Sequence, residues 1–262
     1  MKSSNSNTPA FLAETYEQPK LRKKSDQIAE EMKRLIVIRG MEVGDRLPKE
    51  RDLMEWFACG KGTMREALKS LEIQGLITMR TGPKGGPVLR EPSYARAAEQ
   101  LRTYLNFKHL NIGHIYDARL IIEPEMAVAV VEAINDELLH DLSRACQHSD
   151  NNSEIVRHRE IDFHVTLARH CPNPLLSFQS LFISNLLSDF VRFDNPSNVG
   201  FSRFTKDNCQ HHEQLINAFS AQNHADVRDI MRAHMESAKM HTMELYGTMA
   251  DSILLAPQGV VL

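Results

Sequence analysis

The sequence predicts a mainly α-helical protein, with an N-terminal winged helix-turn-helix that carries a small β wing and a C-terminal all-α bundle of six or seven helices. Two observations predict this fold class. Residues 47–76 contain two short amphipathic segments around a tight turn, and a glycine- and proline-rich hairpin follows them. From Tyr94 onward, apolar stripes of helical spacing recur between polar breaks, with no convincing strand pattern.

The two segments around the turn have the layout of a helix-turn-helix. Helices are expected over about 50–57 and 62–74, with residues 58–61 as the turn. In the second helix the apolar positions face inward, so small and polar residues point outward at its N-terminal end. A recognition helix presents that end to base edges in the major groove. The residues concerned are Lys61, Gly62, Thr63, Arg65 and Lys69.

Another helix and a hairpin complete this unit. The preceding helix is expected to be capped by Ser25 or Asp26. Short strands are expected at 77–80 and 88–90, around a tip that carries Lys84. Three helices followed by such a hairpin form a winged helix. Amphipathic helix pairs by themselves are common outside DNA-binding proteins, so periodicity alone does not establish DNA binding.

Three stretches of this region resemble the DNA-binding domain of GntR-type bacterial transcription regulators: LPKERDL, GKGTMREALKSLEIQGLI and the glycine-rich wing. The resemblance covers about Ser25 to Pro92. It implies a sequence-specific DNA-binding regulator, with repression as the commoner behaviour. The DNA contacts that it implies are Arg51, Lys61, Thr63, Arg65 and the wing around Gly85.

Two positions depart from the usual pattern of this family. Gly60-Lys61 stands where the family usually has Ser-Arg, and Lys49 stands where serine is usual. Because lysine lacks the rigid bidentate fork of arginine, we expect base choice at Lys61 to be altered or relaxed. The loss of both serines removes N-cap hydroxyls, for which glycine is a tolerable substitute.

Composition excludes several classes of protein. The 262 residues are 42% hydrophobic and 25% charged, which suits a globular protein of one or two domains. The chain has no apolar run long enough for a membrane span, and its N-terminus has no apolar signal-peptide core, so we expect a cytoplasmic protein. The four cysteines lie far apart without a CxxC pair, which predicts reduced thiols rather than a disulfide framework or a zinc ribbon.

The distribution of charge separates two domains. Residues 20–92 carry 16 Lys and Arg against 11 Asp and Glu, whereas residues 93–262 carry 14 against 21. A net charge of +5 followed by −7 is typical of a basic DNA-reading domain joined to an acidic sensor. We therefore expect a disordered tail over 1–19, a winged-helix domain over 20–92, a helical effector-binding and dimerisation domain over 93–250, and a C-terminal tail over 251–262.

A carboxylate and three imidazoles in the helical domain form a candidate metal site. Glu160 and His164 are four residues apart and project from one face of a helix, while His212 and His234 lie on later helices. This donor set suits a divalent transition metal such as zinc, manganese or nickel, with positions left open for a ligand. Because the chain has 12 histidines, spacing alone leaves surface or hydrogen-bonded core histidines as the alternative.

The helical domain resembles the all-helical FCD ligand-binding domain of the FadR subfamily of GntR regulators. The resemblance lies in HIYDARLIIEPEMA, REIDFHVTLARHCPNPLL and HHEQLINAFSAQNHADVRDIMRAHMESA. By position it implies Glu160, His164, His212 and His234 as metal ligands, with zinc as the first choice. Aspartate is more usual at the first of these places, so Glu160 is a departure that can shift metal preference or geometry.

The same resemblance places Arg119 in the effector cavity, and Arg192 is a weaker candidate of the same kind. A buried guanidinium beside a metal can clamp a carboxylate, because the metal takes one oxygen and the planar fork takes the other. A salt bridge from Arg119 to Glu123 on the same helix is an equal alternative. We expect the effector to be a small organic acid, such as a sugar acid or hydroxy acid.

Together these features predict a transcription regulator, acting as a repressor, whose operator affinity is controlled by that acid. Since one recognition helix covers only a few base pairs, we expect a homodimer on a palindromic operator. A metal-dependent hydrolase could use the same metal shell, but no nucleophile or acid–base motif accompanies it, and we expect no enzyme. A constitutive DNA-binding protein with structural histidines is the remaining alternative.

Overall fold

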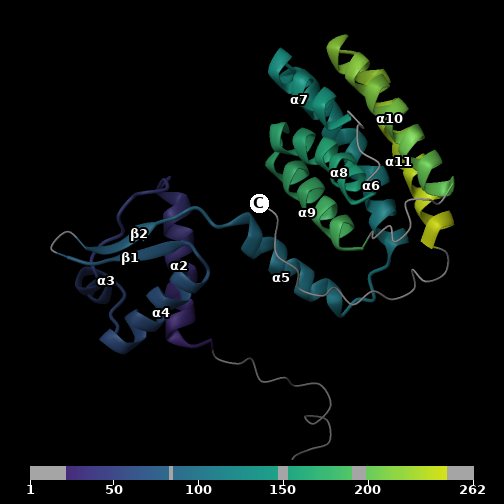
Figure 1. Ribbon diagram of the computed structural model, residues 1–262. Coiled ribbons are helices and arrows are strands. Elements are labelled where there is room, and N and C mark those ends of the chain that lie inside the picture. Colours follow the sequence, from purple (N-terminus) through teal and green to yellow (C-terminus); the bar gives the residue numbers. More distant parts are fainter. Residues whose placement is uncertain (1–21, 83–84, 147–152, 191–198, 247–262) are drawn as a thin grey trace, which may run out of the picture. The chain divides into compact units, whose positions relative to one another are not determined.

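The computed structural model describes residues 22–82, 85–146, 153–190 and 199–246. The chain forms two compact units, which divide between Ser93 and Tyr94. The predicted fold class is confirmed, because a winged helix-turn-helix precedes an all-α bundle (Figure 1). The tails expected at the two ends of the chain lie outside the described residues.

The first unit is the winged helix. Its elements are α2 (Lys24–Ile38), α3 (Glu50–Trp56), α4 (Lys61–Ile73) and the antiparallel strands β1 (Ile77–Arg80) and β2 (Gly86–Leu89). In the strand register, Ile77 lies opposite Leu89 and Arg80 opposite Gly86. The apolar faces of the three helices and the first strand share one core, which includes Met32, Leu53, Met64, Leu71 and Ile77. This core fixes the orientation of α4 within the unit.

The prediction of a serine or aspartate cap for α2 is wrong. The helix begins at Lys24, its N-cap is Lys23, and Ser25 is buried inside the first turn. The ammonium group of Lys24 donates a hydrogen bond to the backbone oxygen of Ala58 at 2.8 Å. An exposed hydrogen bond to the turn between α3 and α4 therefore accompanies the start of α2, where no side chain caps the helix.

The wing requires glycine at Gly85. A Cβ atom there would lie 2.5 Å from the backbone oxygen of Arg80 and 2.8 Å from that of Gly82. The Gly85 amide donates to the same Gly82 oxygen at 2.8 Å, which closes the turn tightly. No residue with a Cβ fits without moving the backbone, so this close approach explains the glycine.

The second unit is an all-α bundle, and its described part contains seven α-helices, within the predicted range. They are α5 (Tyr94–Asn106), α6 (Ile112–Val130), α7 (Asp136–Cys146), α8 (Ser153–His170), α9 (Pro174–Phe190), α10 (Val199–Ser220) and α11 (His224–Tyr246), with a short 3-10 helix at Val131–Ala133. Helix α11 packs against α6 and α10, and α9 packs against α6 and α8. Among the described helices, none is both long and apolar enough to cross a membrane.

Two hydrophobic clusters fill the bundle at different levels. The first, here called cluster A, joins the C-terminal parts of α6, α8 and α10 to the N-terminal half of α11, and includes Val130, Leu167, Phe219 and Met231. The second, cluster B, joins the N-terminal parts of α6 and α10 to α9 and the later part of α11, and includes Tyr116, Phe182, Phe204 and Ala238. The candidate metal site lies on the helices that run through both clusters.

Candidate functional site

Three histidines from three helices converge inside the bundle. His164 on α8, His212 on α10 and His234 on α11 are each at most 3% exposed. Nε2 of His234 lies 3.1 Å from Nε2 of His164 and 3.0 Å from Nε2 of His212. Each residue offers one ligand atom, and these atoms all lie within 4.8 Å of one another. We call these three residues the histidine triad.

A buried glutamate holds the first member of the triad. Oε2 of Glu123, on α6, lies 3.1 Å from Nδ1 of His164, and Glu123 is completely buried. Burial raises the pKa of Glu123, but the His164 imidazole and the Arg119 guanidinium outweigh that effect, so this pKa lies below its usual range. The ionised carboxylate accepts the Nδ1 proton of His164. The Nε2 lone pair of His164 is then turned toward the other two histidines.

The second oxygen of Glu123 forms an ion pair with Arg119. Nε of Arg119 lies 3.5 Å from Oε1 of Glu123, one turn away on α6, and the guanidinium stands 5.5 Å from the ring centre of Tyr116. The salt bridge that the sequence left as an equal alternative is therefore present. It links Arg119 through Glu123 to His164, so Arg119 is connected to the triad whether or not it also contacts an effector.

The protonation of the triad favours a cation at its centre. Burial lowers the pKa of His164, and burial together with His212 and His164 lowers the pKa of His234 well below its usual value. Nε2 of a neutral His234 cannot donate to one neighbour and accept from the other, so protons alone do not satisfy both short contacts. Three imidazole nitrogens within 4.8 Å of one another are a donor set for zinc or a similar ion.

The spacing of the triad also fits a metal. Zinc–nitrogen bonds of about 2.0 Å in a tetrahedral site place neighbouring nitrogens ~3.3 Å apart. The two Nε2 contacts of His234, at 3.0 and 3.1 Å, are close to that separation. The ring of Phe163 stacks on His212 with 3.9 Å between ring centres and 8° between planes, which fixes the orientation of that imidazole.

Several predicted site residues fall outside what the structure describes. Glu160 belongs to α8 one turn before His164, but its side chain lies outside the described part of the chain. Arg192 and Lys84 also lie outside the described residues. Their assignments stay predictions.

The predicted DNA-contacting residues cluster at the start of α4. Helix α4 begins one residue earlier than expected, so Lys61 lies in its first turn and Gly60 is the N-cap, with no side-chain cap. Lys61, Gly62, Arg65 and Lys69 are exposed, and Thr63 is half-buried. Since no side chain caps them, the first amides of α4 are available to a phosphate, for which a helix N-terminus is a ready site.

Two predicted arginines carry acidic partners in this unit. Nε of Arg65 lies 3.1 Å from Oε1 of Glu50, and Nε of Arg51 lies 3.4 Å from Oδ1 of Asp52. Both guanidinium groups are more than half exposed, so these ion pairs stabilise the unit little and are easily exchanged for phosphate contacts. Gly85 lies in the wing, at the tight turn described above, where only glycine fits beside the backbone oxygens of Arg80 and Gly82.

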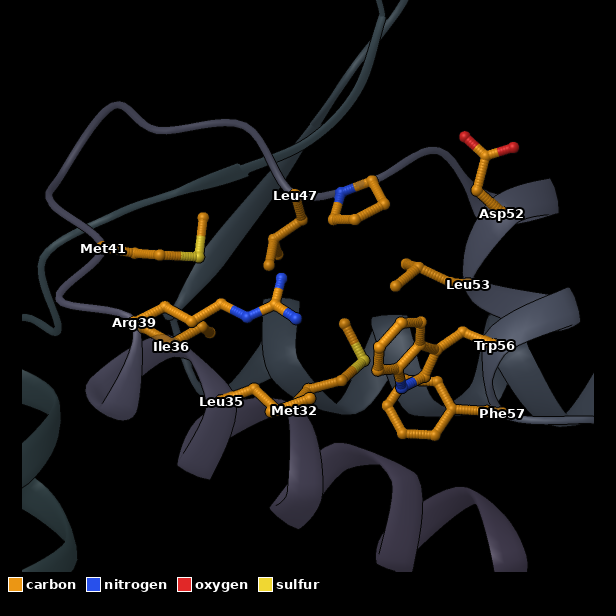
Figure 2. Close-up of a pocket in the computed structure, with 11 residues that line it drawn as sticks. Met32, Leu35, Ile36, Arg39, Met41, Leu47, Asp52, Leu53, Trp56 and Phe57 are labelled. Carbon is orange, nitrogen blue, oxygen red and sulfur yellow. The ribbon is translucent and has the colours of Figure 1, made fainter.

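An apolar cavity of about 230 Å³ lies between α2, α3 and the chain that enters α3. Figure 2 shows the side chains of Met32, Leu53, Trp56 and Phe57 around it, with the Arg39 side chain among them. The Arg39 guanidinium stands 5.7 Å from the ring centre of Trp56. Among the predicted DNA-contacting residues that the structure describes, none lines this cavity.

Sequence reasoning missed two residues that shape the triad. Glu123 was considered only as a partner for Arg119, yet it also binds His164. The available signal was an acidic pair, Glu123 and Glu125, in the apolar stretch IIEPEMAVAV, because a carboxylate buried among apolar residues needs a partner. Phe163 precedes His164 in sequence, but no sequence pattern indicates that its ring stacks on His212.

Comparison with known proteins agrees with this architecture. Residues 24–83 match the family model described as bacterial regulatory proteins, gntR family, and residues 114–237 match the FCD domain. The transcriptional repressor NanR of Escherichia coli K12 is 28% identical over 241 residues, covering 88% of this chain and 89% of NanR; NanR of Shigella flexneri gives the same values. The GntR structure from Streptococcus agalactiae covers 82% of this chain and 99% of its own, with 22% identity and a TM-score of 0.51, which supports the fold.

A winged helix joined to an FCD domain defines a DNA-binding transcription regulator with a separate helical domain, and the relatives named above are regulators rather than enzymes. The chain belongs to the GntR family of bacterial transcription regulators and is of the FadR type.

Proposed function

We propose that this protein is a repressor whose operator affinity is controlled by a small organic acid bound at a metal centre in the FCD domain. The observation that carries the proposal is the convergence of three buried Nε2 atoms, with the Glu123 carboxylate behind His164. Repression is supported by the relatives at 28% identity, which are named as repressors.

His164, His212 and His234 would hold the metal, with Glu160 as the fourth protein ligand and zinc as the first choice over manganese or nickel. When bound, the metal supplies a Lewis-acidic position for an anionic oxygen. The buried Glu123 keeps the His164 imidazole in the tautomer that has its lone pair on Nε2. This arrangement uses no residue as a nucleophile, which suits a sensor better than a hydrolase.

Arg119 supports an anionic effector. Arg119 is 5% exposed, and its Nε lies 3.5 Å from Oε1 of Glu123 on one side of the fork. A carboxylate can take the remaining donors of a guanidinium in bidentate geometry. Glu123 thus connects the group that would bind the acid to the group that would bind the metal, and Arg192 is a second candidate for the same acid.

Effector binding would act on DNA through helix packing. Arg119 and Glu123 belong to α6, which packs against α11, the helix that carries His234. A shift of α6 would pass to the chain near Glu91-Pro92-Ser93 and change the spacing of the two recognition helices of a homodimer on a palindromic operator. The effector can change operator affinity only by the difference between its binding free energies for the two spacings.

The test combines metal analysis with operator binding for the wild type, His212→Ala and His140→Ala. His140 is an exposed histidine of the same unit and serves as the control. The proposal expects about one transition-metal ion per chain in the wild type and His140→Ala, lost in His212→Ala together with the response of operator affinity to carboxylic acids. Unchanged metal content in all three proteins would overturn the metal centre.

If the operator affinity of all three proteins is the same and does not change with acid concentration, the histidines are structural and DNA binding is constitutive. Binding of only neutral or cationic compounds would overturn the organic-acid effector while leaving the metal centre in place.

A further inference from the structure

The cavity between α2 and α3 in the winged helix has an apolar floor and a mouth that is open to water. Met32, Ile36, Leu47 and Leu53 line it and are each at most 9% exposed, whereas Trp56 lines it and is 68% exposed. Its volume is about 230 Å³. Since a cavity of roughly 150 Å³ holds benzene, this one has room for a ligand with two fused rings.

The side chains around the mouth suit an aromatic ligand. Trp56 is the only tryptophan in the sequence, and its exposed ring continues the apolar surface of the cavity. A continuous apolar surface of this kind, next to a few polar groups, marks a binding site. Met32 and Met41 also line the cavity, and thioether sulfurs make favourable contacts with aromatic rings.

Arg39 brings a positive charge to the cavity. It is the C-cap residue of α2, and its side chain extends toward Leu53 and Trp56 (Figure 2), with the guanidinium 5.7 Å from the indole ring centre. Within the described residues, Arg39 has no carboxylate partner. By contrast, Lys33 and Arg34 of the same helix are each paired with a glutamate at 2.8 Å. The charge of Arg39 is therefore available to an anion.

The acidic residue that lines the cavity does not neutralise this charge. The Asp52 carboxylate is directed away from the Arg39 guanidinium (Figure 2), and its Oδ1 lies 3.4 Å from Nε of Arg51. A planar guanidinium can offer two parallel N–H donors to a ligand carboxylate, and this charge-assisted pair is stronger beside apolar groups than in water. The cavity thus combines an apolar floor with one positive charge at its mouth.

We propose that this cavity binds a small aromatic carboxylic acid, with the ring system among the apolar side chains beside Trp56 and the carboxylate on Arg39. The site belongs to the winged-helix unit, whereas the metal centre of the proposed function belongs to the helical unit. It uses neither the histidine triad nor Arg119, so it is a second ligand site, independent of the first.

A ligand in this cavity acts on DNA binding through α3. Helix α3 forms one wall of the cavity, and its first turn carries Glu50 and Arg51. Glu50 pairs with Arg65 of α4 at 3.1 Å, and Arg51 and Arg65 are both predicted DNA contacts. A ligand that shifts α3 relative to α2 moves both arginines, so operator affinity depends on this acid even when the triad holds no metal.

The experiment follows the fluorescence of Trp56 in the full-length protein during titration with 2-naphthoate, and calorimetry gives the stoichiometry. The matched neutral analogue is 2-naphthamide, which has the same two rings without the charge. Both compounds are titrated into the wild type and into His212→Ala, which lacks one triad ligand. The test variant is Arg39→Gln. The control is Arg34→Gln, because Arg34 is an exposed arginine of the same helix that does not line the cavity.

We expect one 2-naphthoate to bind per chain in the wild type and in His212→Ala, to quench Trp56, and to bind about ten-fold more tightly than 2-naphthamide. Arg39→Gln should lose this preference but still bind the amide, and Arg34→Gln should keep it. Bound acid should protect Trp56 from quenching by acrylamide. Saturating acid should change the operator affinity of His212→Ala by about five-fold or more.

The inference is overturned if acid and amide bind equally, if Arg39→Gln keeps the preference, or if the emission of Trp56 shows no saturable change. Loss of binding in His212→Ala would place the acid at the triad, which overturns the cavity site and leaves the proposed function standing. Protection of Trp56 from acrylamide before any acid is added would mean that protein already fills the cavity, which also overturns the site. Unchanged operator affinity in acid-saturated His212→Ala would overturn the effect on DNA binding.

Discussion

Replacement of Glu123 by glutamine tests how the triad is held. The carboxylate is fully buried, lies 3.1 Å from Nδ1 of His164 and lies 3.5 Å from Nε of Arg119. Glutamine keeps the shape and one acceptor oxygen but removes the charge. Arg119, which is 5% exposed, is then left without its buried counter-charge.

Two magnitudes follow from this geometry. Breaking a buried ion pair by removing one partner costs about 3–5 kcal/mol, and since glutamine still accepts one hydrogen bond we expect about 3 kcal/mol of lost unfolding free energy. Loss of the outer carboxylate that orients a ligating imidazole weakens metal binding by about 10–100-fold, or ~1.4–2.7 kcal/mol. The two effects are measured separately, the first by denaturant unfolding without metal and the second by zinc competition against a chelator.

Glu125→Gln is the matched control on the same helix. Glu125 forms an exposed pair with Arg228 at 2.9 Å, so its loss should cost about 1 kcal/mol or less and leave zinc affinity unchanged. If Glu123→Gln and Glu125→Gln bind zinc with the affinity of the wild type, Glu123 does not orient a ligand and the reasoning fails. If both variants are equally stable, the Arg119 pair contributes nothing.

Three further predictions concern other parts of the chain. Lys61→Ala should weaken operator binding and further relax base choice at the position that Lys61 reads, as measured by fluorescence anisotropy with single-base operator variants; equal weakening of specific and non-specific binding would instead indicate a phosphate contact. Gly85→Ala should destabilise the winged helix by about 1–3 kcal/mol, because its Cβ would meet the Arg80 oxygen at 2.5 Å. In Gly62→Ala the added Cβ meets no atom within 4 Å, so the unfolding free energy should rise by up to about 1 kcal/mol while DNA binding weakens. Equal unfolding free energies of the two glycine variants would refute the steric argument. Burial, Cys209 and Glu213 raise the pKa of Cys146 to about 12. Alkylation of this thiol at pH 8 should therefore be at least ~1000-fold slower in the folded protein than in urea, as followed by mass spectrometry of timed samples. A similar rate in both conditions would contradict the raised pKa.

The architecture of both units could be predicted from the sequence, because it depends on local periodicity. The spacing of Met64, Ala67, Leu68 and Leu71 places four apolar side chains on one face of α4, and all four are buried. Since those positions face inward, the polar residues between them must face outward, which is why the candidate DNA-contacting residues could be named. The resemblance to known regulators placed three histidines by position, and the structure brings those three together.

Only the tertiary structure decided what surrounds those positions. Glu123 lies 41 residues from His164 along the chain, and no local pattern pairs them. The start of α2 likewise departs from the capping rule, since its N-cap is Lys23 without a side-chain cap, and the contact of Lys24 with Ala58, 34 positions away, has no local signal. Arg39 and Trp56 look like ordinary surface residues in sequence, and they differ from others only because folding brings them to one cavity.

The sequence by itself therefore determined the order of the helices, the wing and the outward face of the recognition helix, because side-chain periodicity and glycine or proline positions act over a few residues. The family was indicated by the resemblance of its motifs to known regulators. The tertiary structure decided the partner of each buried polar group, including the Arg119–Glu123–His164 chain, and it placed Arg39 beside an apolar cavity. Burial sets the cost of an unpaired polar atom, and burial depends on segments that are distant in the sequence and meet only in the folded bundle.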